Sequence, residues 1–215
     1  MKVLALDTAA AACSAALLVD GAIIASAHVA MMRGHAEALL PMVDAVMAEA
    51  GVAYGALDLI ATTVGPGAFT GLRVGLAAAR GLALAGGLPI IGVTTLEALA
   101  HASVPDGRSV VAVINARRDE VYYQLFDPAL APLGPPQVGP AETVALPEGP
   151  VLLVGDGAER LASDRRDVEI IPGLLPDAAV VAVLAAERFD PAAPPERPPE
   201  PLYLRGSGAR LPAAR

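Results

Sequence analysis

Residues 65–75 (GPGAFTGLRVG) are the segment of this sequence with the clearest potential for chemistry. They follow an apolar run typical of a strand and open a run typical of a helix. At such a junction, backbone N–H groups and the helix dipole can hold an anion. The spacing does not fit a dinucleotide fingerprint, because Thr70 stands where that pattern needs glycine, and no Gly-Lys-Ser/Thr follows as in a phosphate loop. The structural alternative, a tight turn from strand to helix, is the one these residues by themselves favour.

A second candidate lies near the amino terminus, where Asp7 and Thr8 end an apolar run and Ser14 follows a turn of small residues. A carboxylate beside hydroxyls suits a magnesium-phosphate group. An aspartate that only caps a turn explains the pattern equally well. The three histidines have no partner at the spacing of a helical metal pair, and Cys13 fits a buried, inert thiol. We therefore expect no metal site and no catalytic set of residues.

Composition narrows the classes of function. The 215 residues are 54% hydrophobic and only 3% aromatic, with one cysteine and a net charge of −8. This excludes wholesale disorder, and we expect a cytoplasmic protein with no membrane span and no signal peptide. An acidic chain lacks the patch of basic residues that binds phosphates, so we expect it to contact RNA only through a partner protein.

Hydrophobic periodicity predicts a β-β-β-α-β-α-β-α order in the first half. The expected strands are 3–6, 14–19, 22–28, 57–64 and 89–93, and the expected helices are 34–50, 69–85 and 95–102. Strands 109–114, 121–126 and 151–154 and a helix over 178–189 suggest a reduced copy of this pattern. We expect a first lobe at 1–103, a second at 104–190, and a proline-rich tail at 191–215 that packs on the lobes.

The helices expected at 34–50 and 69–85 lack the polar back that a surface helix normally has. Gly71, Gly75, Ala79 and Ala83 recur every four residues and make one face smooth enough for close approach. These features indicate a face that meets another protein. The alternative is that both helices are buried inside this chain.

Several segments together resemble the bacterial TsaB family, also called YeaZ. They are residues 4–8 (LALDT), 34–41 (GHAEALLP), 65–75, 115–122 (NARRDEVY), 155–158 (GDGA) and 201–205 (PLYLR). The resemblance implies a two-lobed, actin-like (sugar-kinase-like) α/β ATPase fold. Asp7, Thr8 and Ser14 then match the first phosphate loop, and Gly155 and Gly157 the second, as vestigial sites. Asn115 departs from the aspartate that the family often has there.

The resemblance also implies a part in making threonylcarbamoyladenosine in tRNA, as a non-catalytic partner of the transferase TsaD. A TsaE-like ATPase completes the system, and the isolated chain is expected to form a homodimer. No cofactor is required, although ATP or ADP with magnesium could lie at a subunit interface. The expected contact residues are His35, Leu39, Met42, Val43, Val46, Phe69, Leu72, Arg73, Leu76, Ala79 and Arg80. The alternative function is a self-sufficient nucleotide-dependent ATPase or phosphotransferase, whereas a peptidase lacks the necessary residues.

Overall fold

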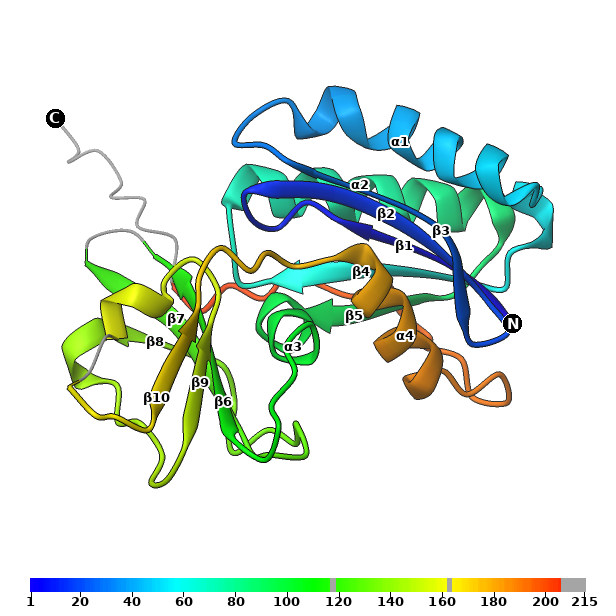
Figure 1. Ribbon diagram of the computed structural model, residues 1–215. Coiled ribbons are helices and arrows are strands. Elements are labelled where there is room, and N and C mark those ends of the chain that lie inside the picture. The colour runs from blue at the N-terminus through cyan, green and yellow to red at the C-terminus, as the bar shows by residue number, and fades with distance from the viewer. Residues whose placement is uncertain (117–118, 162–163, 206–215) are drawn as a thin grey trace, which may run out of the picture.

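The computed structural model describes residues 1–116, 119–161 and 164–205 (Figure 1). The chain forms two lobes, each built on a five-stranded sheet. Two sequence predictions extend outside the described residues: the motif at 115–122 includes residues 117–118, and the C-terminal tail includes residues 206–215.

The first sheet has the strand order β3-β2-β1-β4-β5. Its strands are β1 (Lys2–Asp7), β2 (Ala12–Val19), β3 (Ala22–Ala30), β4 (Leu59–Gly65) and β5 (Ile90–Thr94). Strands β1 to β3 form an antiparallel meander, while β1, β4 and β5 run parallel. Asp20 and Gly21 form the hairpin turn, with φ of 49° and 86° in the left-handed region that this turn requires. The predicted β-β-β-α-β-α-β-α order of elements along the first half is confirmed.

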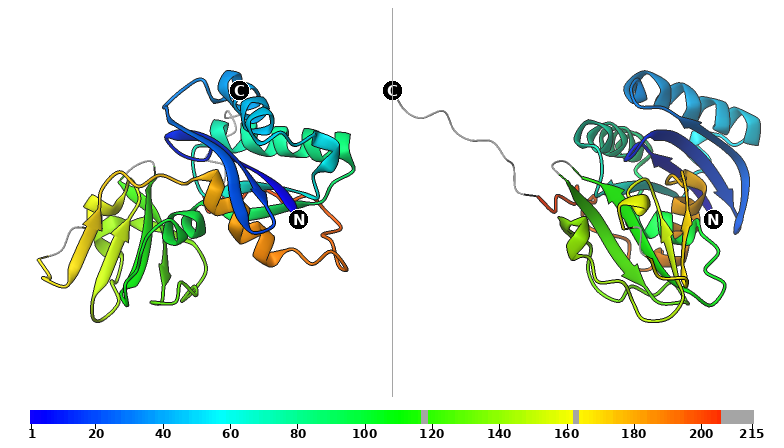
Figure 2. Two further views of the ribbon diagram at one scale, coloured as in Figure 1. Left: turned by 45° about the vertical axis from the view of Figure 1, so that its right-hand side comes forward. Right: turned by 60° about the vertical axis from the view of Figure 1, so that its left-hand side comes forward.

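Helices cover both faces of this sheet. On one face, α1 (His35–Ala50) and α2 (Phe69–Gly86) lie side by side, as both views of Figure 2 show. They end at Gly51 and Gly87, each with φ of 63°, which satisfies the last carbonyls of a helix at the predicted places. The 3-10 turn η1 (Tyr54–Ala56) leads from α1 to β4. On the opposite face, α4 (Ala178–Arg188) packs against the sheet.

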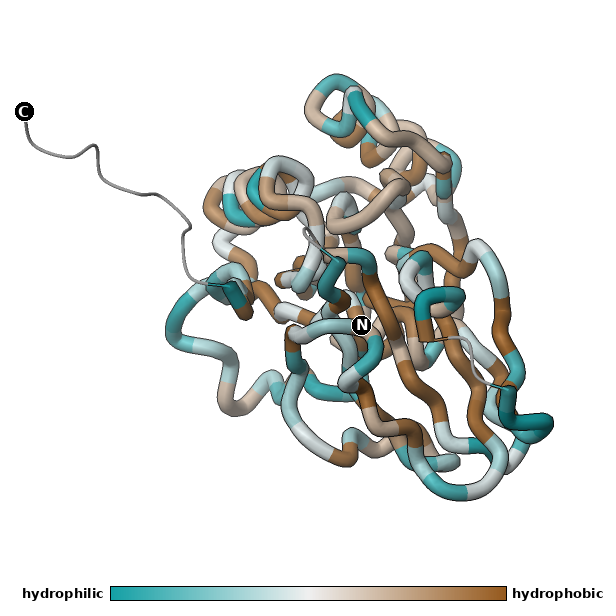
Figure 3. Tube along the Cα trace, turned by 90° about the vertical axis from the view of Figure 1, so that its left-hand side faces the viewer, coloured by the Kyte–Doolittle hydropathy of each residue, from teal (hydrophilic) through white to brown (hydrophobic). Residues whose placement is uncertain are grey.

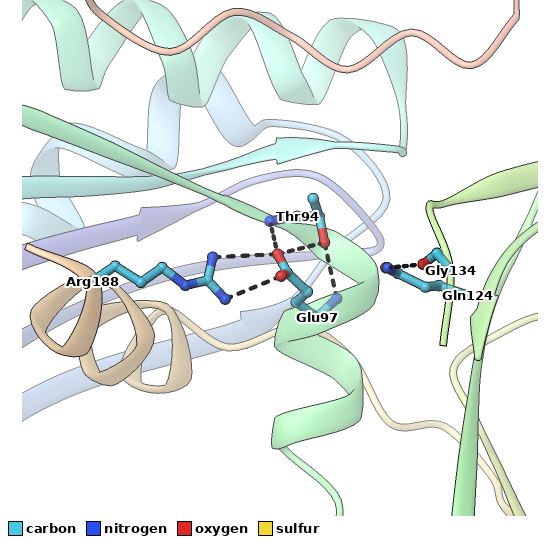
Figure 4. Close-up of polar contacts among 5 residues, drawn as sticks. All are labelled: Thr94, Glu97, Gln124, Gly134 and Arg188. Atoms are coloured by element: carbon cyan, nitrogen blue, oxygen red, sulfur yellow. Dashed lines mark hydrogen bonds and ion pairs between the residues drawn. The ribbon is translucent and has the colours of Figure 1, made fainter. Parts of the chain in front are cut away.

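Helix α3 (Thr95–His101) follows β5 directly, and a capping box starts it. Thr94 is the N-cap, one residue before the threonine at which the sequence analysis begins this helix. Glu97 N donates to Thr94 Oγ1 at 3.1 Å, and Thr94 N donates to Glu97 Oε2 at 3.0 Å (Figure 4). Two otherwise unsatisfied backbone N–H groups are paired in this way, so the helix can begin without a connecting loop.

The second sheet repeats the topology of the first. Its strands are β6 (Ser109–Asn115), β7 (Glu120–Phe126), β8 (Gln137–Pro140), β9 (Val151–Val154) and β10 (Val168–Ile171), in the order β10-β9-β6-β7-β8. As in the first sheet, the opening strand has two strands on one side that each pair antiparallel with their neighbour. On its other side, two strands each pair parallel with their neighbour. The turns η2 (Ala141–Thr143) and η3 (Ala158–Leu161) stand in place of the two long helices. Strands β8 (QVGP) and β10 (VEII) were not predicted, because their polar, glycine or proline residues break the apolar run that made the equally short β9 (VLLV) recognisable.

The last helix of each half packs on the sheet of the other half. Leu96 and Leu99 of α3 join the core of the second sheet. Val181 of α4 joins the core of the first, so α4 lies in the first lobe although it falls within 104–190 of the sequence. Arg188 and Glu97 form an ion pair at 3.1 Å between these two helices (Figure 4). Helices α3 and α4, each packed on the sheet of the other half and joined by this ion pair, therefore connect the two lobes.

Hydrophobic residues concentrate along the strands and hydrophilic residues in the turns, as Figure 3 shows. Phe126, Leu4 and Leu6 are among the largest fully buried side chains. Within residues 1–116, 119–161 and 164–205, the helices are all too short or too polar to cross a membrane.

Candidate functional site

The loop after β1 is closed by the start of α2. Asp7 Oδ1 accepts hydrogen bonds from Thr63 Oγ1 at 2.6 Å and from Ala9 N at 3.1 Å. Thr8 Oγ1 donates to the backbone oxygen of Gly71 at 2.7 Å. Of the residues expected to hold phosphate, Thr8 is therefore in direct contact with the glycine-rich segment of the same chain.

Two glycines of that segment allow this contact. A Cβ at Gly67 would lie 2.2 Å from the Ala9 oxygen, and one at Gly71 would lie 2.1 Å from the Thr8 oxygen. Ala68 N also donates to the Ala9 oxygen at 2.8 Å. The described contacts thus agree with the structural reading of residues 65–75, in which glycine permits a close approach of two backbones.

Asp7 is a buried carboxyl group with incomplete hydrogen bonding. Its Oδ2 atom has no partner among the residues that the structure describes. Burial raises the pKa of Asp7 to about 6, although the hydrogen bonds from Thr63 and Ala9 oppose this shift. Burial, with the charge of Asp7, also raises the pKa of the Cys13 thiol to about 11. Cys13 is therefore protonated at neutral pH, which agrees with the expected inert thiol.

The other residues of the expected phosphate loops also bond or pack within the chain. Ser14 Oγ accepts a hydrogen bond from Ala178 N at 2.9 Å, which serves the first turn of α4. Gly155 has φ of 103°, and a Cβ there would lie 2.2 Å from the Val113 oxygen. Gly157 N donates to the same oxygen at 3.1 Å. In this arrangement the five residues do not fit the phosphates of a nucleotide, because their polar groups and backbones bond or pack within the chain.

Six of the expected contact residues are buried in this chain: Leu39, Val43, Val46, Leu72, Leu76 and Ala79 are at most 4% exposed. The two helices turn these side chains inward, and four of the six belong to the core cluster of the first sheet. In this conformation they cannot reach a partner, so that part of the prediction is corrected. Gly71 and Gly75 likewise approach Thr8 of this chain and not a second protein.

The opposite side of the two helices is an exposed face, called here the α1–α2 outer face. Three of the expected contact residues, Phe69, Arg73 and Arg80, are exposed on this face. Two others, His35 and Met42, are half-buried at its border. Sequence reasoning missed its other exposed members: Ala36, Glu37, Leu40, Pro41, Asp44, Ala45, Ala48 and Glu49 of α1, and Ala77, Gly81, Leu84 and Ala85 of α2. Leu84 is 86% exposed and Leu40 49%. If the most apolar stripe of each helix is assigned to the core, the residues on the opposite side of a helical wheel are the ones listed here.

Residues 199–205, called here the C-terminal strap, border this face. Leu202 N donates to the Val64 oxygen at 2.7 Å, and Arg80 donates to the Pro199 oxygen at 2.7 Å. Arg205 forms an ion pair with Glu120 of β7. The strap therefore runs from the first lobe to the second.

Tyr203 anchors the middle of the strap. Its hydroxyl accepts a hydrogen bond from Arg73 Nε at 3.1 Å, and its ring centroid lies 5.7 Å from that of Phe69. The Arg73 guanidinium lies 3.7 Å above the Phe69 ring. These three side chains form a stacked cluster at the start of α2, with aromatic and cation–π contacts.

We expect Tyr203→Ala to lower the free energy of unfolding by about 2 kcal/mol, because it removes a ring contact and a hydrogen bond. Tyr203→Phe keeps the ring and should lose less than half of that amount. Urea denaturation of both variants measures the difference. Equal losses would show that the hydroxyl, and not the ring, holds the strap.

Comparison with known proteins identifies the family. The family model described as TsaD, tRNA N6-adenosine threonylcarbamoyltransferase, matches residues 28–152, more than half of the chain. A solved Pseudomonas aeruginosa protein described as similar to peptidase YeaZ superposes with a TM-score of 0.85 at 36% identity, covering 95% of this chain and 99% of that one. The chain belongs to the TsaB/YeaZ branch of the TsaD family.

Two further relatives define how far this likeness extends. Haemophilus influenzae TsaB, named as a tRNA threonylcarbamoyladenosine biosynthesis protein, is 42% identical over 57% of this chain and 52% of its own length. The chain thus spans about half the length of that curated TsaB protein. An uncharacterized Mycobacterium tuberculosis protein is 33% identical over 97% of this chain and 93% of its own.

The family assignment agrees with the fold. A Clostridium difficile dehydratase activator solved with bound ADPNP superposes with a TM-score of 0.51 at 12% identity, which speaks for the fold alone. The prediction of a two-lobed, actin-like α/β fold with a reduced second lobe is confirmed. Within the described residues, His, Cys, Asp and Glu side chains form no group of three or more that could hold a metal.

Proposed function

We propose that this TsaB-family chain is a non-catalytic scaffold subunit in the formation of threonylcarbamoyladenosine on tRNA. It binds a TsaD-type transferase subunit through the α1–α2 outer face, and a TsaE-type ATPase joins the complex. The family assignment supports the pathway, since the named relative is a threonylcarbamoyladenosine biosynthesis protein. The net charge of −8 supports contact with tRNA only through the complex.

One observation carries the scaffold role: the α1–α2 outer face combines small residues with exposed large apolar ones. Phe69 is 54% exposed, Leu40 49% and Leu84 86%. The alanines and glycine between them permit a second pair of helices to approach closely, and Arg73 and Phe69 supply the kind of side chain that dominates interface energies. The same face can pair with only one partner at a time, so occupancy by the transferase subunit excludes other uses of it.

We expect Leu84→Glu to reduce co-purification of the host's TsaD-type subunit at least tenfold, because a desolvated carboxylate opposes an apolar contact. The measurement is capture of the co-expressed subunit by tagged chain. Leu133→Glu is the matched control, since Leu133 is 58% exposed on the second lobe. Unchanged capture by Leu84→Glu would contradict docking on this face.

The alternative, a self-sufficient nucleotide-dependent ATPase or phosphotransferase, has a separate test. Calorimetric titration of the isolated chain with MgATP should give no micromolar binding. Micromolar binding that Asp7→Ala destroys would favour the alternative. The buried position of Asp7 supports the scaffold over the enzyme, because in this conformation the carboxyl group is closed off from a magnesium ion in solution.

A further inference from the structure

The C-terminal strap holds both charged side chains of α2, which are arginines. Arg73 Nε donates to the Tyr203 hydroxyl at 3.1 Å, and Arg80 Nη2 donates to the Pro199 oxygen at 2.7 Å. Arg73 also lies 3.7 Å above the Phe69 ring. Both arginines are nevertheless exposed. The strap therefore fixes the direction of two surface cations, which reduces the conformational entropy that each loses on binding a ligand.

Neither arginine is paired with an acid. Within residues 1–116, 119–161 and 164–205, no ion pair involves Arg73 or Arg80. The two terminal nitrogens of Arg73 donate to no described residue, and neither does Nη1 of Arg80. Each guanidinium thus keeps N–H donors for an acceptor outside the described part of the chain. A carboxylate is the acceptor that matches a guanidinium best among protein side chains.

The two arginines lie on the same side of α2. Seven residues make two helical turns to within about 20°, and they span about 10 Å along the axis. Ala77 lies between them and is exposed, about one turn from each. Its small side chain permits a helix of another protein to approach α2 closely. Two carboxylates that lie two turns apart on such a helix match the spacing of the arginines.

Helix α1 has the opposite charge. It contains no lysine or arginine, and its three acidic residues, Glu37, Asp44 and Glu49, are exposed. In the described part of the chain, none of these acids forms an ion pair with an arginine of α2. The α1–α2 outer face is therefore acidic on α1 and basic along α2 and the strap. Such a division selects the orientation and the identity of a partner.

We infer that the TsaD-type subunit covers α2 with an acidic helix, whose carboxylates bind Arg73 and Arg80, and covers α1 with basic residues. The inference rests on the proposed function, because it takes the α1–α2 outer face as the docking surface. It adds the charge of the partner surface and a role for the strap. Tyr203 and Pro199 are positioning residues that hold the two arginines for the partner's carboxylates. The acidic α1 beside them disfavours the phosphates of an RNA, which are negative along the whole backbone.

Charge neutralisation tests the arginines, with the dissociation constant of the purified TsaD-type subunit for the full chain as the measurement. Arg73→Gln and Arg80→Gln should each weaken binding about tenfold, and both together about a hundredfold. The wild type should also lose affinity with added salt more steeply than the double variant. Arg166→Gln is the matched control, since Arg166 is exposed on the second lobe, and it should bind like the wild type.

Tyr203→Phe tests the strap, because it removes only the hydroxyl that holds Arg73. It should weaken binding about threefold in the wild type and have no effect in the Arg73→Gln background. A hydroxyl with a merely structural role would give the same loss in both backgrounds, and that result would overturn the positioning role.

The outcomes separate this inference from the proposed function. If the double glutamine variant binds like the wild type or like Arg166→Gln, while Leu84→Glu still abolishes binding, the charge assignment is wrong and docking on this face stands. If the double variant keeps its affinity for the subunit but the assembled complex loses tRNA, the arginines bind RNA phosphates and the inference is overturned. If Leu84→Glu also binds normally, the docking surface itself is wrong.

Discussion

Replacing Gly71 with alanine is expected to lower the free energy of unfolding by more than about 3 kcal/mol, the range of severe overpacking. The added Cβ would lie 2.1 Å from the Thr8 oxygen and 3.3 Å from its carbonyl carbon. Both are backbone atoms of the loop after β1, and the hydrogen bond from Thr8 Oγ1 to Gly71 fixes the same distance. Neither side can give way without moving α2 off the sheet.

Gly81→Ala is the matched control on the same helix. A Cβ at Gly81 meets nothing within 4 Å, so alanine should stabilise the chain by about 1 kcal/mol through its helix propensity. Urea denaturation of the two variants therefore gives changes of opposite sign. If the urea midpoint of Gly71→Ala equals that of the wild type, α2 lies farther from the loop after β1 than in this structure.

Asp7→Asn is expected to change the pH dependence of stability. The folded-state pKa of Asp7 is raised from 3.8 to about 6, so between these values the folded chain holds a proton that the unfolded chain releases. The wild type therefore loses stability as pH rises through this window, by about 3 kcal/mol in total at 1.36 kcal/mol per pKa unit. Asparagine has no charge to bury and should not show this loss.

The quantity to measure is the difference in unfolding free energy between variant and wild type at pH 4 and at pH 7. We expect it to shift by about 3 kcal/mol in favour of asparagine at the higher pH. Thr63→Val removes the hydrogen bond that lowers the pKa of Asp7, so it should steepen the loss in an otherwise wild-type chain. Parallel pH profiles for all three proteins would contradict a buried carboxyl group with a raised pKa.

Much of the fold could be predicted from local pattern. The turn at Asp20 and Gly21, the glycines that end α1 and α2, and the order of elements along the first lobe all follow from residue types at short spacing. Strands β8 and β10 could not, because neither is a continuous apolar run like the equally short β9, and both depend on pairing with β7 and β9.

The candidate site shows the same division. The sequence identified the two helices, but it placed Val46 and Leu76 on the outside, where the structure has Leu40 and Leu84. Nearly all-apolar helices give little contrast between faces, so periodicity alone does not orient them. The strap was seen as a proline-rich tail. Its contact with Arg73 depends on residues 130 positions apart in the chain, which no local pattern encodes.

By itself, the sequence determined which segments become strands and helices, where they end, and the family to which the chain belongs. The tertiary structure alone decided which side of α1 and α2 faces solvent, that Asp7 is fully buried, and that β3 is left as an open edge. The physical reason is that backbone propensities and turn geometry act over a few residues. Burial, by contrast, is settled only when distant segments compete for the same apolar surface.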